Sequence, residues 1–409
     1  MFNLESFINQ YVTKRQTSMF EPDILSNWDN LSVSIEDKSV LVIGGAGSIG
    51  SSFIRAILPF RPSILVIVDT NENALTELTR SLRSNPLLFP CIPDTYLPYP
   101  MDYSSVTFRR MFKHYERSSG SPGFDIVANF SAHKHVRSEK DIYSIEALLR
   151  NNVINAKGLL DLLEAYPPEA YFCVSTDKAA NPVNIMGASK RIMEDLIFCY
   201  SPSFPVKTAR FANVAFSNGS LPAGFLERIN QHQPLSAPMD VRRYFVSPAE
   251  SGQICMLSCM LGSNRAIFFP KLEETQMTTL DRIAEDLLRS YGYEVGYCDT
   301  DIEAIVKSRV WTEDQPYPVF FSSSDTSGEK AFEEFHTDTE TVDMSAFESL
   351  GVITDKPVPD KTKLIDFITV LDNAFGSEKC AKADILRIIG QYLPNFSHIE
   401  TGKSLDDRM

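Results

Sequence analysis

One short segment of the sequence carries polar side chains suited to acid–base chemistry. Ser175, Thr176, Asp177 and Lys178 end an apolar run that is typical of a strand, and Lys190 follows on a predicted helix. Hydride transfer from an alcohol needs a base for the hydroxyl proton, a cation that lowers the pKa of that hydroxyl, and donors for the developing carbonyl oxygen. Thr176, Asp177, Lys178 and Lys190 can supply all three. A surface ion pair between Asp177 and Lys178 at the start of a helix is the alternative.

Position 186 departs from the pattern usual at such a site. In short-chain dehydrogenases a Tyr stands four residues before the active-site Lys, and here Met186 occupies that place before Lys190. A thioether cannot transfer a proton. Either this chemistry has been lost, or another group replaces the Tyr, and the adjacent Asp177-Lys178 pair is the obvious substitute.

A glycine-rich turn lies upstream, between a β-branched run and a helical pattern. Its GGAGSIG motif supplies the candidate cofactor-binding residues Gly44, Gly47, Ser48, Ile49 and Gly50. Glycines permit a tight turn and let a pyrophosphate approach the N–H groups of the helix N-terminus. Asp69 ends the next strand and can accept hydrogen bonds from an adenosine ribose, which favours NAD over NADP. Asp102 is a second candidate near the adenine, although a solvated loop aspartate is an equally good interpretation.

Short apolar runs must position both motifs. They are SVLVIGG at 39–45, ILVIVD at 64–69, FDIVANFSA at 124–132, AYFCVSTD at 170–177 and FPVKTARFANV at 204–214. Their alternation with longer helical patterns predicts an α/β protein with a Rossmann-type, doubly wound parallel sheet. Such sheets bind ligands at the carboxyl ends of their strands, where the glycine turn and the Asp177 segment both lie.

The chain divides into four predicted parts. They are an N-terminal helical extension (1–37), an NAD(P)-binding Rossmann domain (38–215), a smaller and mainly substrate-binding domain (216–335), and a C-terminal helical tail (336–409). The boundary at 215 rests on the weaker strand–helix rhythm and the more frequent prolines beyond it.

The composition of the chain limits the kinds of partner and the compartment that we expect. The 409 residues carry 39 Lys and Arg against 53 Asp and Glu, a formal net charge of −14, which argues against a nucleic-acid partner. No apolar run approaches the roughly 18 residues of a membrane span, and the N-terminus lacks a signal-peptide pattern. Seven scattered cysteines and the pair His133 and His135 lack the spacing of a metal site. We therefore expect a cytoplasmic protein without a membrane span or a bound metal.

Several motifs together resemble those of one family, the bacterial polysaccharide-biosynthesis proteins that act as UDP-N-acetylglucosamine 4,6-dehydratases. They are GGAGSIG (44–50), SAHKHV (131–136), STDKAANPVNIMGASKR (175–191), RFANVAFSNGS (210–220), RRYF (242–245) and GEKAFEEF (328–335). The resemblance covers roughly residues 38–335 and implies an extended short-chain dehydrogenase with NAD, or with NADP, as its cofactor. It also implies a nucleotide-sugar substrate and self-association into a homo-oligomer.

The resemblance assigns roles to individual residues. Members with Met in place of Tyr are held to use the Asp and Lys of STDK as acid and base and to retain the C5 configuration, which implies these roles for Asp177 and Lys178. Lys190 would hold the nicotinamide ribose, and Thr176 would contact the sugar. Further implied contacts are Ser131 and Ala132 for the cofactor, and Lys134, His135, Asn213, Arg243 and Glu329 for the substrate.

The sequence departs from the family at two places. Ile43 stands where Thr is frequent, and Thr326-Ser327 stand where Arg-Pro usually precedes GEK. The missing Arg leaves a GDP-linked or other nucleotide sugar as an alternative donor.

Three functions are open at this point: a 4,6-dehydratase that supplies deoxyamino sugars for surface glycans, a 4-epimerase, and a non-catalytic NAD(H)-binding protein. Met186 counts against the epimerase, whose base is normally Tyr. The joint presence of Asp177, Lys178 and Lys190 counts against the non-catalytic protein, so we predict the dehydratase.

Overall fold

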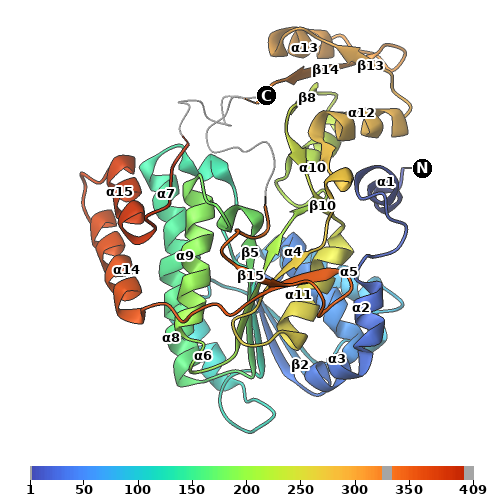
Figure 1. The fold of residues 1–409 in the computed structure, drawn as a ribbon. Coiled ribbons are helices and arrows are strands. Elements are labelled where there is room, and N and C mark those ends of the chain that lie inside the picture. Colours follow the sequence, from blue (N-terminus) through green and yellow to red (C-terminus); the bar gives the residue numbers. More distant parts are fainter. Residues whose placement is uncertain (1, 325–333, 400–409) are drawn as a thin grey trace.

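A computed structural model describes residues 2–324 and 334–399, and its centre is a large β-sheet (Figure 1). Within these ranges the sheet has nine strands in the order β15-β16-β11-β6-β5-β4-β1-β2-β3. Their bounds are β1 (Ser39–Ile43), β2 (Ile64–Asp69), β3 (Thr95–Pro100), β4 (Ile126–Asn129), β5 (Ala170–Thr176), β6 (Val206–Phe211), β11 (Ile267–Pro270), β15 (Thr341–Asp343) and β16 (Leu350–Thr354). The run β3-β2-β1-β4-β5-β6 is parallel throughout and has the Rossmann order, so the predicted fold is confirmed.

The sheet extends beyond the part that the sequence predicted. The five apolar runs form β1, β2, β4, β5 and β6, with the last continuing into the short β7 (Asn213–Val214). Beyond β6 the sheet adds β11 in parallel, then β16 and β15 in antiparallel pairing. The segment after residue 335 therefore contains strands as well as the predicted helices. The domain boundary at 215 stays a prediction, because later residues also complete this sheet.

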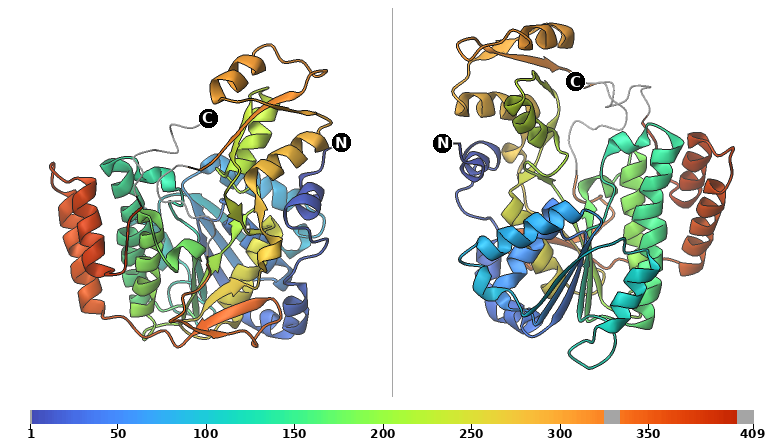
Figure 2. Two further views of the ribbon diagram at one scale, coloured as in Figure 1. Left: turned by 45° about the horizontal axis from the view of Figure 1, so that its top comes forward. Right: turned by 180° about the vertical axis from the view of Figure 1, so that it is seen from behind.

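Helices cover both faces of the sheet, as the view from behind shows most clearly (Figure 2). One face carries α2 (Glu21–Ser26), α3 (Trp28–Ile35), α4 (Ser48–Ile57), α5 (Glu72–Ser84) and α11 (Pro248–Leu261). The other carries α6 (Val106–His114), α7 (Ile142–Leu149), α8 (Ala156–Ala165) and α9 (Ile185–Cys199), with α14 (Lys361–Phe375) and α15 (Lys382–Tyr392) outside them. In β1, Val40 and Val42 face the first layer and Leu41 and Ile43 the second, which explains why the strand is apolar from Val40 to Ile43.

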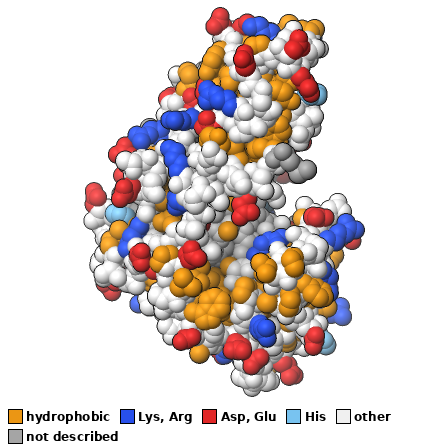
Figure 3. All heavy atoms as spheres, turned by 90° about the vertical axis from the view of Figure 1, so that its right-hand side faces the viewer, with side chains coloured by type: hydrophobic (Ala, Val, Ile, Leu, Met, Phe, Trp, Pro, Cys, Tyr) orange, Lys and Arg blue, Asp and Glu red, His pale blue; other side chains and the backbone are white. Residues whose placement is uncertain are grey.

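A smaller domain stands at the carboxyl edge of the sheet, and an indentation separates it from the larger body (Figure 3). It contains the strands β8 (Leu235–Pro238), β13 (Val295–Tyr297) and β14 (Tyr317–Ser322) and the helices α10 (Leu221–Asn230), α12 (Leu280–Ser290) and α13 (Asp301–Ser308). Phe7, Ile8 and Val12, in α1 (Leu4–Phe7) and the π-helical turn after it, are buried in the core of this domain. The N-terminal extension therefore joins the small domain to the body.

Two short strand pairs lie where the two parts meet. β7 pairs with β10 (Phe245–Val246), and β9 (Arg242–Arg243) pairs with β12 (Thr278–Thr279). They place the motifs RFANV and RRYF side by side. Over the described ranges, no helix is both long and apolar enough to cross a bilayer.

Candidate active site

The glycine turn joins β1 to α4 and requires glycine most strictly at its two ends. Gly44 has φ +70°, and a Cβ atom there would lie 2.6 Å from the backbone nitrogen of Ser131. A Cβ atom on Gly50 would lie 2.4 Å from the carbonyl oxygen of Gly44. Gly47 is the N-cap of α4, and a Cβ atom there would lie 3.3 Å from the same oxygen, a tighter contact than usual but less severe than the other two. Since a glycine N-cap has no side chain to occupy the first N–H groups of α4, they can meet a phosphate.

The two aspartates predicted to lie near the adenosine differ in position. Asp69, at the end of β2, accepts hydrogen bonds from the N–H of Ala46 (3.1 Å) and of Asn71 (2.9 Å), so it holds the glycine turn in place. Asp102 follows β3, is exposed, and caps the N–H of Ser104 at 2.7 Å. The structure thus connects Asp69 with the turn and places Asp102 in a local turn of its own.

A cleft of about 330 Å³ opens at the carboxyl ends of β1, β4, β5 and β6. The residues predicted from the sequence that line it are Gly44, Gly47, Ser48, Ile49, Gly50, Ala132, Lys134, Thr176, Asp177, Lys178, Met186, Lys190 and Asn213. Asp69, Asp102, Ser131, His135 and Arg243 lie outside this lining, and Glu329 lies outside the described residues. The lining residues that sequence reasoning missed are Phe130, Val174, Ser175, Phe211, Ala212, Val214, Ser217 and Asn218.

Three donors converge on one carboxylate oxygen at the end of β5. Oδ1 of Asp177 accepts from the hydroxyl of Thr176 (2.8 Å), the backbone N–H of Lys178 (2.9 Å) and the ammonium of Lys178 (3.1 Å). The side chain of Asp177 is 4% exposed and that of Lys178 18%. The ion pair therefore exists and lies in the cleft, with Asp177 buried and Lys178 partly exposed, so it is not a fully solvated surface pair.

Helix α9 brings Met186 and Lys190 against this strand end. A Cβ atom on Gly187 would lie 2.7 Å from the carbonyl oxygen of Lys178, so the helix starts in close contact with residues 175–178. We call residues 175–178 the catalytic segment, after the role that we propose for them. The ammonium of Lys190 donates to the carbonyl of Val174 at 2.9 Å. Burial lowers the pKa of Lys190 to about 8, against the opposing influence of Cys173 and Glu194. Met186 is buried and lines the cleft where a Tyr would stand.

A buried asparagine that the sequence analysis missed connects the loop after β4 with α9. Asn152 lies in the π-helical turn Arg150–Asn155 that joins α7 to α8. Its side chain accepts from the N–H of His133 and donates to the carbonyl of His133, both at 2.9 Å, and it donates to the hydroxyl of Ser189 at 3.0 Å. The asparagine pair within the apolar pattern LLRNNVIN is the signal that marks this site, because a buried amide needs partners.

The predicted substrate contacts lie where the two domains meet. Asn213 lines the cleft on β7 and donates its N–H to the carbonyl of Tyr244 at 3.0 Å. Arg243 is largely buried beside it and donates to the carbonyl of Arg242 at 3.0 Å. His135 reaches the loop before α10, since a Cβ atom on Gly219 would lie 2.9 Å from its Nε2. In the described part of the chain, no three His, Cys, Asp or Glu side chains gather as metal ligands.

Strand order, glycine turn and cleft together define an α/β protein of the Rossmann class with its candidate site at the switch point between β1 and β4. The family model for polysaccharide biosynthesis proteins matches residues 40–354, and the chain belongs to that family. The match contains the glycine turn, the Asp177 segment and both lysines of the site.

Relatives in the same family carry different names. An uncharacterized membrane protein of Methanocaldococcus jannaschii is 27% identical over 333 residues, 80% of this chain and 88% of that protein. The probable polysaccharide biosynthesis protein EpsC of Bacillus subtilis is 26% identical over 75% of this chain, which spans about half (48%) of EpsC. The inverting UDP-N-acetylglucosamine 4,6-dehydratase of Campylobacter jejuni is 25% identical over 59% of this chain and 70% of its own length.

Solved structures share the fold at lower identity. Pen from Bacillus thuringiensis superposes with a TM-score of 0.62 at 19% identity, covering 82% of this chain and 98% of Pen. The dTDP-glucose 4,6-dehydratase DesIV of Streptomyces venezuelae, solved with NAD and TYD bound, has a TM-score of 0.53 at 18% identity and covers 73% and 88%. These likenesses show the fold.

Proposed function

We propose that the protein is an NAD-dependent nucleotide-sugar 4,6-dehydratase that converts UDP-N-acetylglucosamine into a UDP-4-keto-6-deoxy-N-acetylhexosamine. The observation that carries this proposal is the ion pair of the buried Asp177 with Lys178 in a cleft that also holds Lys190, with Met186 in place of the usual Tyr. The family and the Campylobacter relative support the substrate class. The product would serve the synthesis of surface glycans.

The cleft suits NAD. The glycine turn would let the pyrophosphate reach the N-terminus of α4. Asp69, at the end of β2, is suited to accept hydrogen bonds from the hydroxyls of the adenosine ribose. A 2′-phosphate would face the Asp69 carboxylate, which favours NAD over NADP. The buried ammonium of Lys190 would hold the nicotinamide ribose. When bound, NAD would accept a hydride from C4 of the sugar and return it to C6.

Asp177 would take the proton of the 4-hydroxyl. Within the described residues its three donors all reach Oδ1, which leaves Oδ2 to accept a substrate proton. The hydroxyl of Thr176 lies beside it to orient the sugar oxygen. Removal of this proton as the hydride leaves gives a 4-ketone.

Lys178 and Asp177 would then complete the elimination. The 4-ketone acidifies the C5 proton, so a base can remove it while an acid protonates the departing 6-hydroxyl as water. Asp177, which lies 3.1 Å from Lys178, would give the proton taken from the 4-hydroxyl to that departing hydroxyl, while Lys178, as the neutral amine after its ammonium proton has passed to solvent, takes the C5 proton and later returns a proton to C5. Met186 cannot donate a proton from the side where Tyr usually stands, and we propose that C5 is reprotonated with its configuration retained.

Proton NMR of the protein with UDP-N-acetylglucosamine and NAD⁺ in D₂O tests this function. A 4-keto-6-deoxy sugar with deuterium at C5 is the expected product, and its ring couplings report the C5 configuration. A C4 epimer without loss of water would identify an epimerase instead. If neither UDP-linked nor GDP-linked sugars change, a non-catalytic NAD(H)-binding protein replaces the proposal. Lys178→Ala serves as the matched inactive sample.

A further inference from the structure

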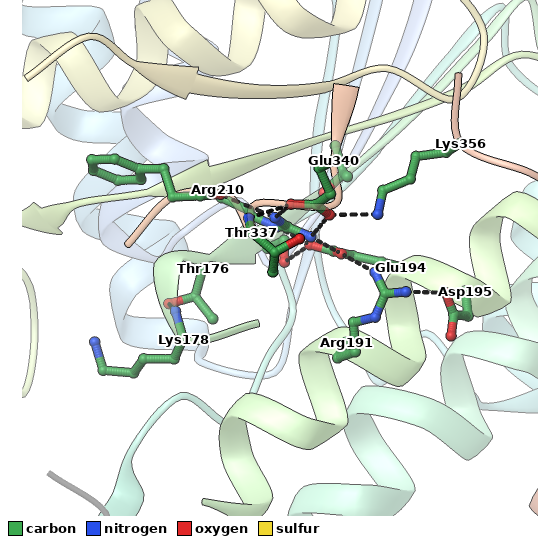
Figure 4. A network of polar contacts seen from close by, with 12 residues as sticks. Thr176, Lys178, Arg191, Glu194, Asp195, Arg210, Thr337, Glu340 and Lys356 are labelled. Carbon is green, nitrogen blue, oxygen red and sulfur yellow. Dashed lines mark hydrogen bonds and ion pairs between the residues drawn. The ribbon is translucent and has the colours of Figure 1, made fainter. Parts of the chain in front are cut away.

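A buried arginine in the central sheet uses all five of its N–H donors on three partners (Figure 4). Arg210, on β6, donates from Nε and Nη2 to the two carboxylate oxygens of Glu194 at 2.9 and 2.8 Å. Its Nη1 and Nη2 donate to the two oxygens of Glu340 at 2.7 and 2.9 Å, and Nη1 also donates to the carbonyl of Phe335 at 3.0 Å. Such paired, two-point contacts fix the guanidinium plane and both carboxylates.

The charges around Arg210 balance. Lys356 forms an ion pair with Glu340, and Arg191 contacts both Glu194 (3.2 Å) and Asp195 (3.3 Å). Burial alone would raise the pKa of Glu340, but the hydrogen bonds and charges of Arg210 and Lys356 lower it to about 2. Removing one carboxylate would therefore leave an uncompensated cation in the protein interior.

One end of this network reaches the catalytic segment. Oε1 of Glu194, which accepts from Arg210, also accepts from the hydroxyl of Ser175 at 2.6 Å. Ser175 lines the cleft and directly precedes Thr176 on β5. Glu194 lies one turn after Lys190 on α9, so a single buried carboxylate contacts the end of β5 and belongs to the helix that carries the site lysine.

The other end of this network is Glu340, which lies 130 positions after Arg210 in the sequence. Glu340 lies just before β15, and its loop is closed by the N–H of Thr337, which donates to its carboxylate at 2.9 Å. A second contact from the same segment reaches the loop after Lys178, where the side chain of Asn181 donates to Glu334 at 3.0 Å. Residues 334–340 therefore hold the catalytic segment at two points.

We propose that Glu340 is a positioning residue, which through Arg210, Glu194 and Ser175 fixes the end of β5 relative to α9. It does not line the cleft, so its effect on chemistry must pass through these side chains. The effect of Glu340 on turnover rests on the function proposed above. Its effect on the position of β5 relative to α9 does not depend on that function.

Glu340→Gln tests the connection, since it keeps the size of the side chain and removes its charge. We expect kcat to fall about 10- to 100-fold while KM and NAD affinity change less than about threefold, because misplacement of catalytic groups affects mainly the chemical step. Glu340→Asp should recover part of the loss. Glu164→Gln is the control: it removes an ion pair to Lys361 of the C-terminal segment that does not lead to Ser175.

A double-variant cycle gives the sharper test. If Ser175 and Glu340 act through one chain of contacts, Ser175→Ala and Glu340→Gln each reduce kcat, and the double variant is within about twofold of the worse single one. Multiplicative effects on kcat, or a kcat of Glu340→Gln equal to that of Glu164→Gln, would overturn the proposal.

Amide hydrogen exchange separates this proposal from the enzymatic function. In Glu340→Gln, peptides that cover 174–178 and 185–194 should exchange faster together with 334–340, whether or not the protein turns over any sugar. Faster exchange confined to 334–340 would mean that Glu340 stabilises only its own loop. If Glu340→Gln does not fold in a thermal scan, Lys356→Met, which weakens the outer ion pair, takes its place in the same measurement.

Discussion

The glycine turn (44–50) and the segment 175–178 both line one cleft, and we call them its backbone wall and its side-chain wall because they are built in different ways. The turn is made by backbone within a short stretch of chain, with Asp69 holding the N–H of Ala46. The catalytic segment depends on side chains from β5, α9, β6 and the loop before β15, and Arg210 and Glu340 are 130 positions apart. A site built from backbone can therefore be predicted from a short stretch of sequence. A site held by ion pairs cannot, because its residues are distributed along the chain.

The largest effect should come from the side-chain wall. Lys178→Ala removes the ammonium that contacts Asp177, and we expect turnover to fall by about 10²- to 10⁴-fold, the usual contribution of an acid–base group. Asp177→Asn should have a comparable effect. NAD affinity, measured by calorimetry, should stay within about twofold of the unmodified protein.

Lys157→Ala, which breaks an exposed pair with Asp161 on α8, is the control for that variant and should leave turnover unchanged. Turnover by Lys178→Ala at the rate of this control would remove Lys178 from the proposed mechanism.

On the backbone wall, two glycines should respond differently. Gly50→Ala places a Cβ atom 2.4 Å from the carbonyl of Gly44, so we expect a loss of about 1–3 kcal/mol in the free energy of unfolding together with loss of NAD binding. Gly47→Val should lose NAD binding, because its side chain would stand at the N-terminus of α4, where we propose the phosphate. Its Cβ atom would lie 3.3 Å from the carbonyl oxygen of Gly44, so we expect a smaller loss of stability than in Gly50→Ala.

Urea unfolding and NAD calorimetry on the same samples check both glycine variants. Gly390→Ala, in α15 with open space around it, is the control that should not lose stability. Full NAD affinity in Gly47→Val would refute the placement of the pyrophosphate at this turn.

The difference between the walls also explains what the sequence could predict. The five predicted strands and the glycine turn follow from local patterns, and the glycine motif lies between β1 and α4, as predicted. The Asp177-Lys178 pair was predicted because its members are adjacent. Ser175, although it stands in the same motif, was missed, because its partner Glu194 is recognised only once α9 packs on β5.

The remaining misses have the same origin. β11 and β16 join the sheet from beyond the predicted domain boundary, because pairing of distant strands leaves no local signature. Asp102 also follows a strand end and caps the N–H of Ser104, and its contact with the adenine stays a prediction. Glu340 lies in an acidic stretch that looks solvated, and only the buried Arg210 explains its charge.

A smaller effect is expected from Asp69, where backbone and side chain meet. Asp69→Asn keeps one oxygen for the N–H of Ala46, loses the acceptor for the N–H of Asn71, and removes the charge that disfavours a 2′-phosphate. NADP affinity should therefore rise about tenfold relative to NAD, a change of about 1.4 kcal/mol. Calorimetry with both cofactors measures this ratio, and Glu72→Gln, close by at the start of α5, is the control for charge alone. An unchanged ratio would mean that Asp69 serves only the turn.

The smallest effect concerns pH and Lys190. Burial lowers the pKa of this ammonium to about 8, below the value of about 10.4 for an unfolded lysine. Raising the pH from 7 to 9 should therefore remove its charge in the folded protein and weaken NAD binding a few-fold. The same protonation makes a separate contribution to stability: between about pH 8 and 10.4 the unfolded chain holds one more proton, so this contribution rises with pH.

Lys190→Arg keeps a charge at these pH values and should flatten the pH dependence of NAD affinity measured by calorimetry. If the unmodified protein and Lys190→Arg lose NAD affinity in parallel as the pH rises, another titratable group in the cleft controls this pH dependence. A flat profile for Lys190→Arg alone would instead assign the titration to Lys190 and support its proposed contact with the nicotinamide ribose.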